Sequence, residues 1–368
     1  MSQMQTAMGS VQLKRGWKAY LLLALGLIAF VVYIYLFRVD LQEIIVNIQQ
    51  LDVPLYALAA CLAVLNVLFF ALSWRSLLHF LMVKLSVVKS FLYCWYGIFI
   101  DAVVPAESIS GEVSRLYLVT REDNTVSGKV VASLVVQRII GMGVNIASLI
   151  LGITALSTLG QLTGTVLNVT VFLVFGVSAV IALLALLCVK EKWTLGIVNG
   201  FMRIAEFLTR GRFKLAKFKD EVVTAARMFH DSIREFRRGS KSLFASTSYN
   251  VASWALDMIV VYLVFLSVRY YAIHWSVVVL TISIIVAIKS IPVGIPFEAG
   301  LPEIAMSSLF IWLGVPAQTA FTVTILSRLL TMWLRFFIGF GVQQWLEIGQ
   351  VKVATKSIQT SEPAAQKA

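Results

Sequence analysis

The sequence has little charge and few of the residues that build metal or redox sites. Of its 368 residues, 14% are charged and 59% are hydrophobic, whereas a soluble domain carries about 25% charged residues. This composition excludes a soluble globular protein, because lipid must cover so much apolar surface. The three cysteines, Cys61, Cys94 and Cys188, all lie in apolar stretches and form no CxxC pair. We therefore expect neither a metal site nor a cofactor.

Catalytic motifs are also missing. The chain has no GxxxxGK[ST] phosphate-binding loop, no GxSxG nucleophile elbow and no HExxH zinc motif. The polar segments leave no room for a soluble catalytic domain. We therefore expect a protein that is not an enzyme, and any transport that it performs to be passive or coupled to an ion gradient.

The sequence does contain long apolar stretches. A helix of about 20 apolar residues crosses the hydrocarbon core of a bilayer. A short segment, 38–53, has helical spacing of apolar residues and suits a helix in the membrane interface. We predict an all-α polytopic membrane protein with about six full spans, at 17–37, 54–79, 130–157, 165–189, 243–268 and 317–346.

Basic residues set the expected orientation. The chain has 31 lysines and arginines against 19 acids, and basic residues of membrane proteins collect on the cytoplasmic side. The segment 190–242 is rich in them, so we place it in the cytoplasm. The same count places residues 1–16 and the polar, disordered tail 347–368 in the cytoplasm of a multi-pass protein.

The segment 190–242 also has an apolar face, which runs from Phe218 to Phe236 at helical spacing. A basic amphipathic helix of this kind is expected to lie on the anionic inner leaflet. The positive charge is explained equally well if the segment only fixes the orientation of the protein in the membrane and binds no particular lipid. Nucleic-acid binding is not expected, because the apolar face and the flanking spans argue against it.

Two further apolar segments are predicted to be re-entrant helical hairpins. By the orientation above, 88–119 begins and ends inside and 275–313 begins and ends outside, which a single crossing cannot do. Each arm is also too short to span. The two hairpins would therefore enter from opposite faces. Helix-breaking residues mark their tips, namely Pro105 and Gly111 in the first hairpin and Pro292, Gly294, Pro296 and Gly300 in the second.

The two tips resemble each other in sequence. PAESISGE from Pro105 aligns with PFEAGLPE from Pro296 without a gap, and an arginine follows each tip at a similar distance, Arg138 and Arg328. We predict an inverted repeat, with units at about 54–157 and 243–346, in a single membrane domain over 17–346. Inverted repeats whose broken helices meet at mid-membrane are a recurring plan of transporters.

Charged residues at membrane depth cost about 2.5 to 3.5 kcal/mol each, so they must pair or face water. One interpretation is that they are structural clips that hold irregular backbone. The other is a midplane polar cavity in which cations hold an anionic head group and glutamates act as counter-ions or proton acceptors. The candidate substrate-binding residues are Arg115, Arg138, Arg328, Lys289, Glu107, Glu112, Glu298 and Glu303. Glu112 and Arg115, one helical turn apart, are expected to meet.

Three short motifs carry a family resemblance: Pro105, Gly111, Glu112 and Arg115; the pair Gln137-Arg138; and the stretch from Pro292 to Glu303. With these motifs the chain, over about 17–346, resembles the flippase-like integral membrane family typified by the transmembrane region of lysylphosphatidylglycerol synthase. The resemblance implies a plasma-membrane protein with membrane lipids as partners.

The function that the resemblance implies is translocation of a head group between leaflets. The cargo would be an anionic phospholipid or a polyprenyl-phosphate-linked glycan. Two alternatives stay open from the residues. One is an integral membrane transferase that acts on a lipid-linked substrate, and the other is an ion-coupled solute transporter.

Overall fold

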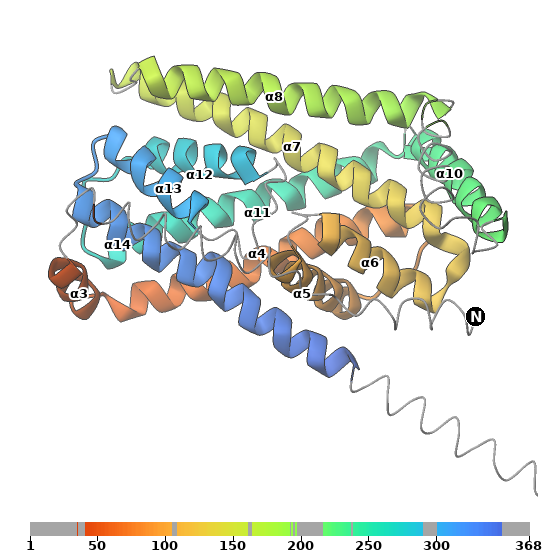
Figure 1. Cartoon of the computed structure of the whole chain (residues 1–368), viewed down its shortest axis with the longest axis horizontal. Coiled ribbons are helices and arrows are strands. Elements are labelled where there is room, and N and C mark those ends of the chain that lie inside the picture. The colour runs from red at the N-terminus through yellow and green to blue at the C-terminus, as the bar shows by residue number, and fades with distance from the viewer. Residues whose placement is uncertain are drawn as a thin grey trace, which may run out of the picture.

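The protein is a bundle of helices (Figure 1). A computed structural model describes residues 41–104, 109–160, 164–191, 216–236, 238–289 and 300–347, with the single residues 35, 193 and 196. The described residues form no β-strand. The predicted segments 1–16 and 17–37, apart from Tyr35, lie outside these ranges, as do most of 192–215 and the tail from 348 onward.

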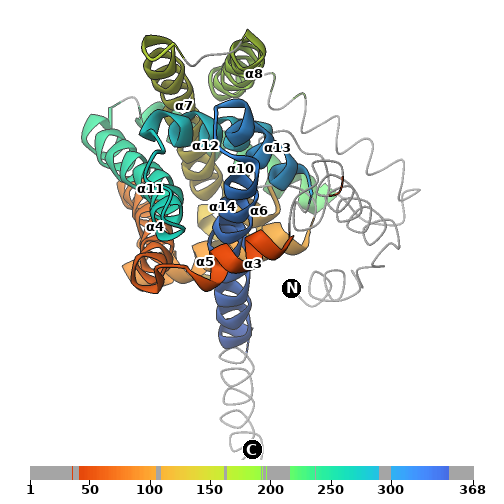
Figure 2. The same cartoon turned by 90° about the vertical axis from the view of Figure 1, so that its left-hand side faces the viewer.

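The first half of the chain forms two long helices with two short ones between them. A short helix, α3 (Leu41–Gln49), comes before this half in the chain and lies crosswise at one end of the long helices (Figures 1 and 2). Its elements are α4 (Val53–Phe80), α5 (Val87–Val103), α6 (Ile109–Glu122), the 3-10 turn η1 (Asn124–Val126) and α7 (Ser127–Thr158).

The second half repeats this order of long, short, short and long helices. It is separated from the first half by α8 (Gly164–Val189) and α10 (Ala216–Phe236). Its last helix passes through a π-helical turn, η3 (Leu329–Leu334), and continues to Glu347. Its other elements are α11 (Ser240–Ser267), α12 (Trp275–Lys289), α13 (Leu301–Trp312) and α14 (Ala317–Arg328).

Five of the described helices are long and apolar enough to cross a membrane: α4, α7, α8, α11 and the helix that α14 begins. They coincide with five of the six predicted spans. The four short helices, α5, α6, α12 and α13, have 17 residues at most, and at about 1.5 Å per residue they fall short of a ~30 Å core. Their re-entrant course and the total number of spans stay predictions.

Capping residues fix where the helices α4 and α5 begin. The Asp52 carboxylate accepts a hydrogen bond from the Leu55 N–H at 3.2 Å, and Pro54 stands in the first turn of α4. The Ser86 hydroxyl accepts one from the Lys89 N–H at 3.2 Å at the start of α5. Both caps satisfy backbone donors that the first helical turn leaves unpaired.

The helices α4 and α11, each of 28 residues, lie side by side and run antiparallel (Figure 1). Asn66 Nδ2 donates to the Ser253 carbonyl oxygen at 2.5 Å, and the Ser73 hydroxyl donates to the Ser246 carbonyl oxygen at 3.0 Å. As the residue number rises along α4, the number of the partner residue on α11 therefore falls. Small residues on α4, including Ala63, are fully buried and let the helices approach closely. The two halves therefore begin with oppositely directed helices, as an inverted repeat requires.

The helix α7 makes polar contacts both within the first half and with the second half. Trp74 Nε1 of α4 donates to the Ser133 hydroxyl at 3.0 Å, and Asn145 Nδ2 donates to the Ser283 carbonyl oxygen of α12 at 3.1 Å. Gly152 lies against α12, where a Cβ atom would come within 2.9 Å of the Leu280 Cβ. Side chains that bond across helices hold a bundle together where the hydrophobic effect is weak.

The helix α10 packs apolar side chains of its second half on protein. Phe229 and Phe236 are buried, and the Phe236 ring stacks on Phe80 with centroids 5.4 Å apart. Gly128 of α7 faces α10 so closely that a Cβ atom would lie 2.7 Å from the Met228 Cβ. This part of the apolar face, which the sequence pattern assigned to the inner leaflet, is therefore covered by the bundle. Contact of the basic face with anionic lipid stays a prediction.

Candidate functional site

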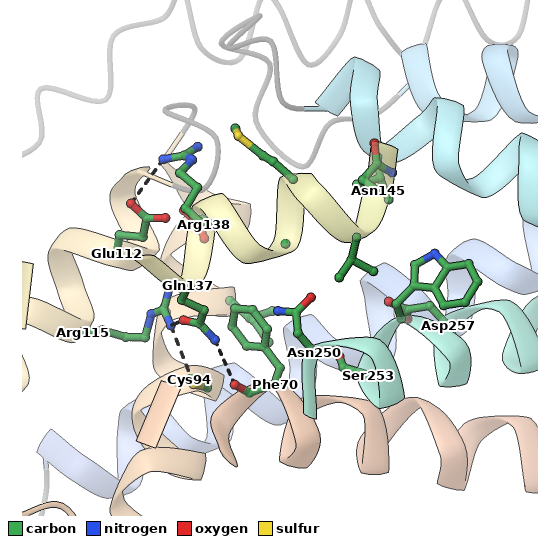
Figure 3. A pocket seen from close by; sticks show the side chains of 18 of the residues that line it. Phe70, Cys94, Glu112, Arg115, Gln137, Arg138, Asn145, Asn250, Ser253 and Asp257 are labelled. Carbon is green, nitrogen blue, oxygen red and sulfur yellow. Dashed lines mark hydrogen bonds and ion pairs between the residues drawn. The ribbon is translucent and has the colours of Figure 1, made fainter. Parts of the chain in front are cut away.

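A cavity of about 340 Å³ lies inside the helix bundle. Its walls come from both halves of the chain. Figure 3 shows Glu112, Arg115 and Arg138 on one side and Asn250, Ser253 and Asp257 on the other. This volume lies at the lower end of the range for small-ligand sites, so it suits a head group rather than a whole lipid. The polar and charged lining residues are Asp101, Glu112, Arg115, Gln137, Arg138, Asn145, Asn250, Ser253 and Asp257.

An ion pair stands at one side of this cavity. Arg138 Nη1 of α7 lies 3.2 Å from Glu112 Oε2 of α6, and the two side chains are 23% and 20% exposed. Both residues were predicted as site residues. Because both side chains keep part of their surface exposed, an anion that enters the cavity can contact Arg138 while the ion pair is in place.

Arg115 does not meet Glu112 as the one-turn spacing predicted. Its guanidinium carbon lies 5.3 Å and 5.1 Å from the ring centroids of Phe70 and Trp74. Its Nη1 donates to Gln137 Oε1 at 3.1 Å, and Gln137 Nε2 donates onward to the Phe70 carbonyl oxygen at 3.0 Å. Arginine is suited to stacking on aromatic faces. Within the part of the chain that the structure describes, Arg115 forms no ion pair, so it brings positive charge to the cavity wall.

Asp101 was not among the predicted site residues. Its Oδ1 accepts hydrogen bonds from the Gly111 N–H at 2.6 Å and the Ser110 hydroxyl at 2.7 Å. It thereby ties the end of α5 to the start of α6. Gly111 and Gly97 allow this approach, since a Cβ atom on Gly111 would lie 2.7 Å from the Gly97 carbonyl oxygen. The predicted tip residue Gly111 therefore has a packing role.

The other ends of α5 and α6 are joined by Lys89 and Glu122. Lys89 Nζ lies 2.8 Å from Glu122 Oε2, and the Tyr93 hydroxyl donates to the same carboxylate. Partial burial alone would raise the pKa of Glu122, but the hydrogen bonds from Lys89 and Tyr93 outweigh it and lower the pKa below its usual value. The two short helices are thus fastened at both ends.

The second half contains a matching ion pair. Arg328 Nε lies 2.6 Å from Glu303 Oε1, and the side chains are only 9% and 12% exposed. Glu303 Oε2 also accepts a hydrogen bond from the Gly300 N–H at 2.8 Å. Gly300 has φ of +95°, a conformation that favours glycine, so this predicted tip residue begins α13. Neither member of the pair lines the cavity.

The two pairs occupy equivalent places in the two halves. In each, a glutamate in the first turn of the second short helix meets an arginine of the following long helix. The halves differ one turn later, where Arg115 in α6 corresponds to the buried Met306 in α13. The charged side chains that line the cavity therefore belong to the first half and to α11.

A third ion pair links the helix that α14 begins to the cavity. Arg335 Nη2 lies 2.7 Å from Asp257 Oδ1 of α11 and donates to Asn66 Oδ1 of α4 at 3.1 Å. The π-helical turn η3 lies between Arg328 and Arg335, and such turns inside α-helices are frequent at functional sites. Asp257 and Arg335 are visible in the sequence as intramembrane charges, but only their packing places Asp257 in the cavity.

Two lining groups lack a partner among the residues that the structure describes. The indole N–H of Trp254 and the side-chain oxygen of Asn145 are buried, and neither makes a hydrogen bond to those residues. A buried polar atom without a partner is costly. A hydrated or ligand-bound cavity would supply the missing bonds.

One described candidate, Lys289, does not join this site. Lys289 is the last described residue of α12 and does not line the cavity. The described residues contain no cluster of three or more histidine, cysteine or acidic side chains that could hold a metal ion. Six predicted residues lie outside the described part of the chain, namely Glu107, Glu298, Pro105, Pro292, Gly294 and Pro296.

The fold and the cavity define a polytopic helical membrane protein with a charged site inside its bundle. A model of the family described as the lysylphosphatidylglycerol synthase TM region matches residues 21–339, and the chain belongs to this family. It is also 25% identical over 332 residues to the UPF0104 membrane protein PH1989 of Pyrococcus horikoshii, which covers 88% of this chain and 95% of that protein. The predicted family is therefore confirmed, and with it an integral membrane protein of a family linked to lipid handling.

Proposed function

We propose that the protein translocates the anionic head group of a lipid between the two leaflets through the cavity. The cargo is an anionic phospholipid or a polyprenyl-phosphate-linked glycan, and the acyl or prenyl chains stay in the surrounding lipid. The protein then acts as a transporter rather than an enzyme, in the plasma membrane and with both termini in the cytoplasm.

The accessible Glu112–Arg138 pair carries this proposal. A phosphate that reaches Arg138 replaces the Glu112 carboxylate as its partner, so the guanidinium never loses its counter-ion. Glu112 then takes up a proton or faces a cationic group of the cargo. Arg115 adds a second positive charge in the wall, held in place by Gln137 and two aromatic rings.

Leaflet exchange of a labelled lipid tests the proposal. The purified protein is reconstituted in liposomes with a fluorescent phosphatidylglycerol, and an impermeant quencher reports the fraction of label on the outer leaflet. We expect exchange above that of protein-free liposomes, and a loss of at least about tenfold in Arg138→Gln, because a charge-assisted bond to phosphate contributes about 1.5 to 3 kcal/mol.

Arg227→Gln is the matched control, because Arg227 is exposed on α10 and does not line the cavity. It should exchange lipid at the wild-type rate. Wild-type exchange in Arg138→Gln, or no exchange for any anionic lipid, would contradict the proposal. Flux of small ions without lipid exchange would instead favour an ion-coupled solute transporter, and covalent turnover of a lipid-linked substrate would favour a transferase.

A further inference from the structure

We propose that a second cavity, at the junction of α4 and α11, binds the phosphate of an anionic phospholipid of the cytoplasmic leaflet. It has a volume of about 690 Å³ and shares no lining residue with the central cavity. The site is a resting place for a lipid and not a part of the translocation route proposed above.

The charge of this second cavity is all of one sign. Three cationic side chains line it, Arg75, Arg238 and Lys241, together with His79, and no carboxylate does. None of the four forms an ion pair with any described residue. Cations gathered in one concave site repel one another unless an anion joins them.

The local structure aims donors into the same space. Arg75 Nε donates to the Leu85 carbonyl oxygen at 2.9 Å, which fixes the guanidinium while its terminal nitrogens bond no described residue. The helix α11 begins after Gly239 without a side-chain cap, so its first backbone N–H groups are available to a ligand. A helix N-terminus of this kind favours a negative group.

The cavity walls are firmly held. The Ser242 hydroxyl donates to the Ser76 carbonyl oxygen at 2.9 Å and joins α11 to α4. Gly239 lies against the Phe80 ring, where a Cβ atom would come within 2.5 Å of Cζ. The basic groups thus surround a preformed space, which limits the entropy that a ligand must overcome on binding.

The surroundings point to a lipid as the source of the phosphate. Phe244 and Val251, which are 76% and 43% exposed, lie two turns apart on α11, a helix that lines the basic cavity. The helix is one of the membrane-crossing candidates, so these side chains lie beside acyl chains. Its basic end is the one that the positive-inside rule assigns to the cytoplasm, and basic pockets between such helix ends bind anionic head groups.

Binding of short-chain lipids to the full-length protein in a neutral detergent tests this site. Native mass spectrometry counts bound dihexanoyl phosphatidylglycerol, and thermal denaturation reports the affinity. We expect phosphatidylglycerol to bind and to raise the melting temperature more than dihexanoyl phosphatidylcholine does. Lys241→Gln and Arg238→Gln, both at exposed positions, should each weaken binding by about tenfold, because each removes one charge-assisted contact.

Two controls separate this proposal from the proposed function. Lys84→Gln removes an exposed charge at the same end of the bundle without touching the cavity, and it should bind as the wild type does. Arg138→Gln should lose lipid exchange and keep this binding. Equal binding by wild type, Lys241→Gln and Arg238→Gln would overturn the site, and equal stabilisation by inorganic phosphate at the same concentration would overturn its assignment to a lipid.

Discussion

At the scale of single residues, the two equivalent ion pairs differ in how deeply they lie. Glu303 and Arg328 are about nine-tenths buried, whereas Glu112 and Arg138 keep about a fifth of their surface open. Removing one member of a buried pair leaves an uncompensated charge, which costs far more than the pair contributes. The buried pair therefore stabilises one arrangement of α13 against α14, and the open pair is the one that a ligand can exchange.

Glu303→Gln should consequently destabilise the protein by about 3 to 5 kcal/mol, whereas Glu112→Gln should cost about 1 kcal/mol. Equilibrium unfolding in detergent micelles measures both losses. The double variant Glu303→Gln/Arg328→Gln should recover part of the stability, since it removes the stranded charge as well. Equal losses in the two single variants would show that burial does not distinguish the pairs.

At the scale of elements, the contact between α5 and α6 depends on glycine. Gly97 and Gly111 bring the two backbones together, and Asp101 then reaches the Gly111 N–H. Because the Gly97 carbonyl oxygen belongs to a helix backbone, it cannot move aside as a flexible side chain can. The spacing of these short helices, and with it the position of Glu112 at the cavity, rests on that contact.

Gly111→Ala should therefore cost about 1 to 3 kcal/mol through overpacking and should move Glu112 away from Arg138. Gly143→Ala is the matched control, because a Cβ atom on Gly143 of α7 meets nothing within 4 Å. That change should be neutral or should stabilise the helix by about 0.5 to 1 kcal/mol. Thermal unfolding of both variants decides the matter, and an equal response of the two would contradict the role given to Gly111.

At the scale of the whole molecule, the opposite directions of α4 and α11 bear on how the protein sits in the membrane. If the basic ends face the cytoplasm, Ser127 at the start of α7 lies inside and Thr158 at its end lies outside. In a variant that lacks the three native cysteines, Thr158→Cys should react with an impermeant maleimide on intact cells. Ser127→Cys should react only after the cells are opened. Labelling of both from one side would contradict the orientation.

Much of this architecture could be predicted from the sequence, since apolar length alone located five spans and short motifs located the family. The residues of the first half that meet at the cavity were partly predictable, because Glu112, Arg115 and Arg138 are charged where charge is costly. The contributions of Asn250, Ser253 and Asp257 were not, because they depend on how α11 packs against α4, nearly two hundred residues earlier in the chain. The partners of Arg115 were also missed, since the rings of Phe70 and Trp74 lie on another helix and Glu112 pairs with Arg138 instead.

The bond between Asn66 and Ser253 has a mechanical consequence. Each residue stands at the middle of a 28-residue helix, so the bond marks the midpoint of the contact between α4 and α11. If the two halves of the molecule rotated against each other about this midpoint, the Asn66–Ser253 contact would be the pivot. The bond between these two residues would then keep its length. The Ser73–Ser246 bond, seven residues and about 10 Å away, would lengthen as the rotation grew.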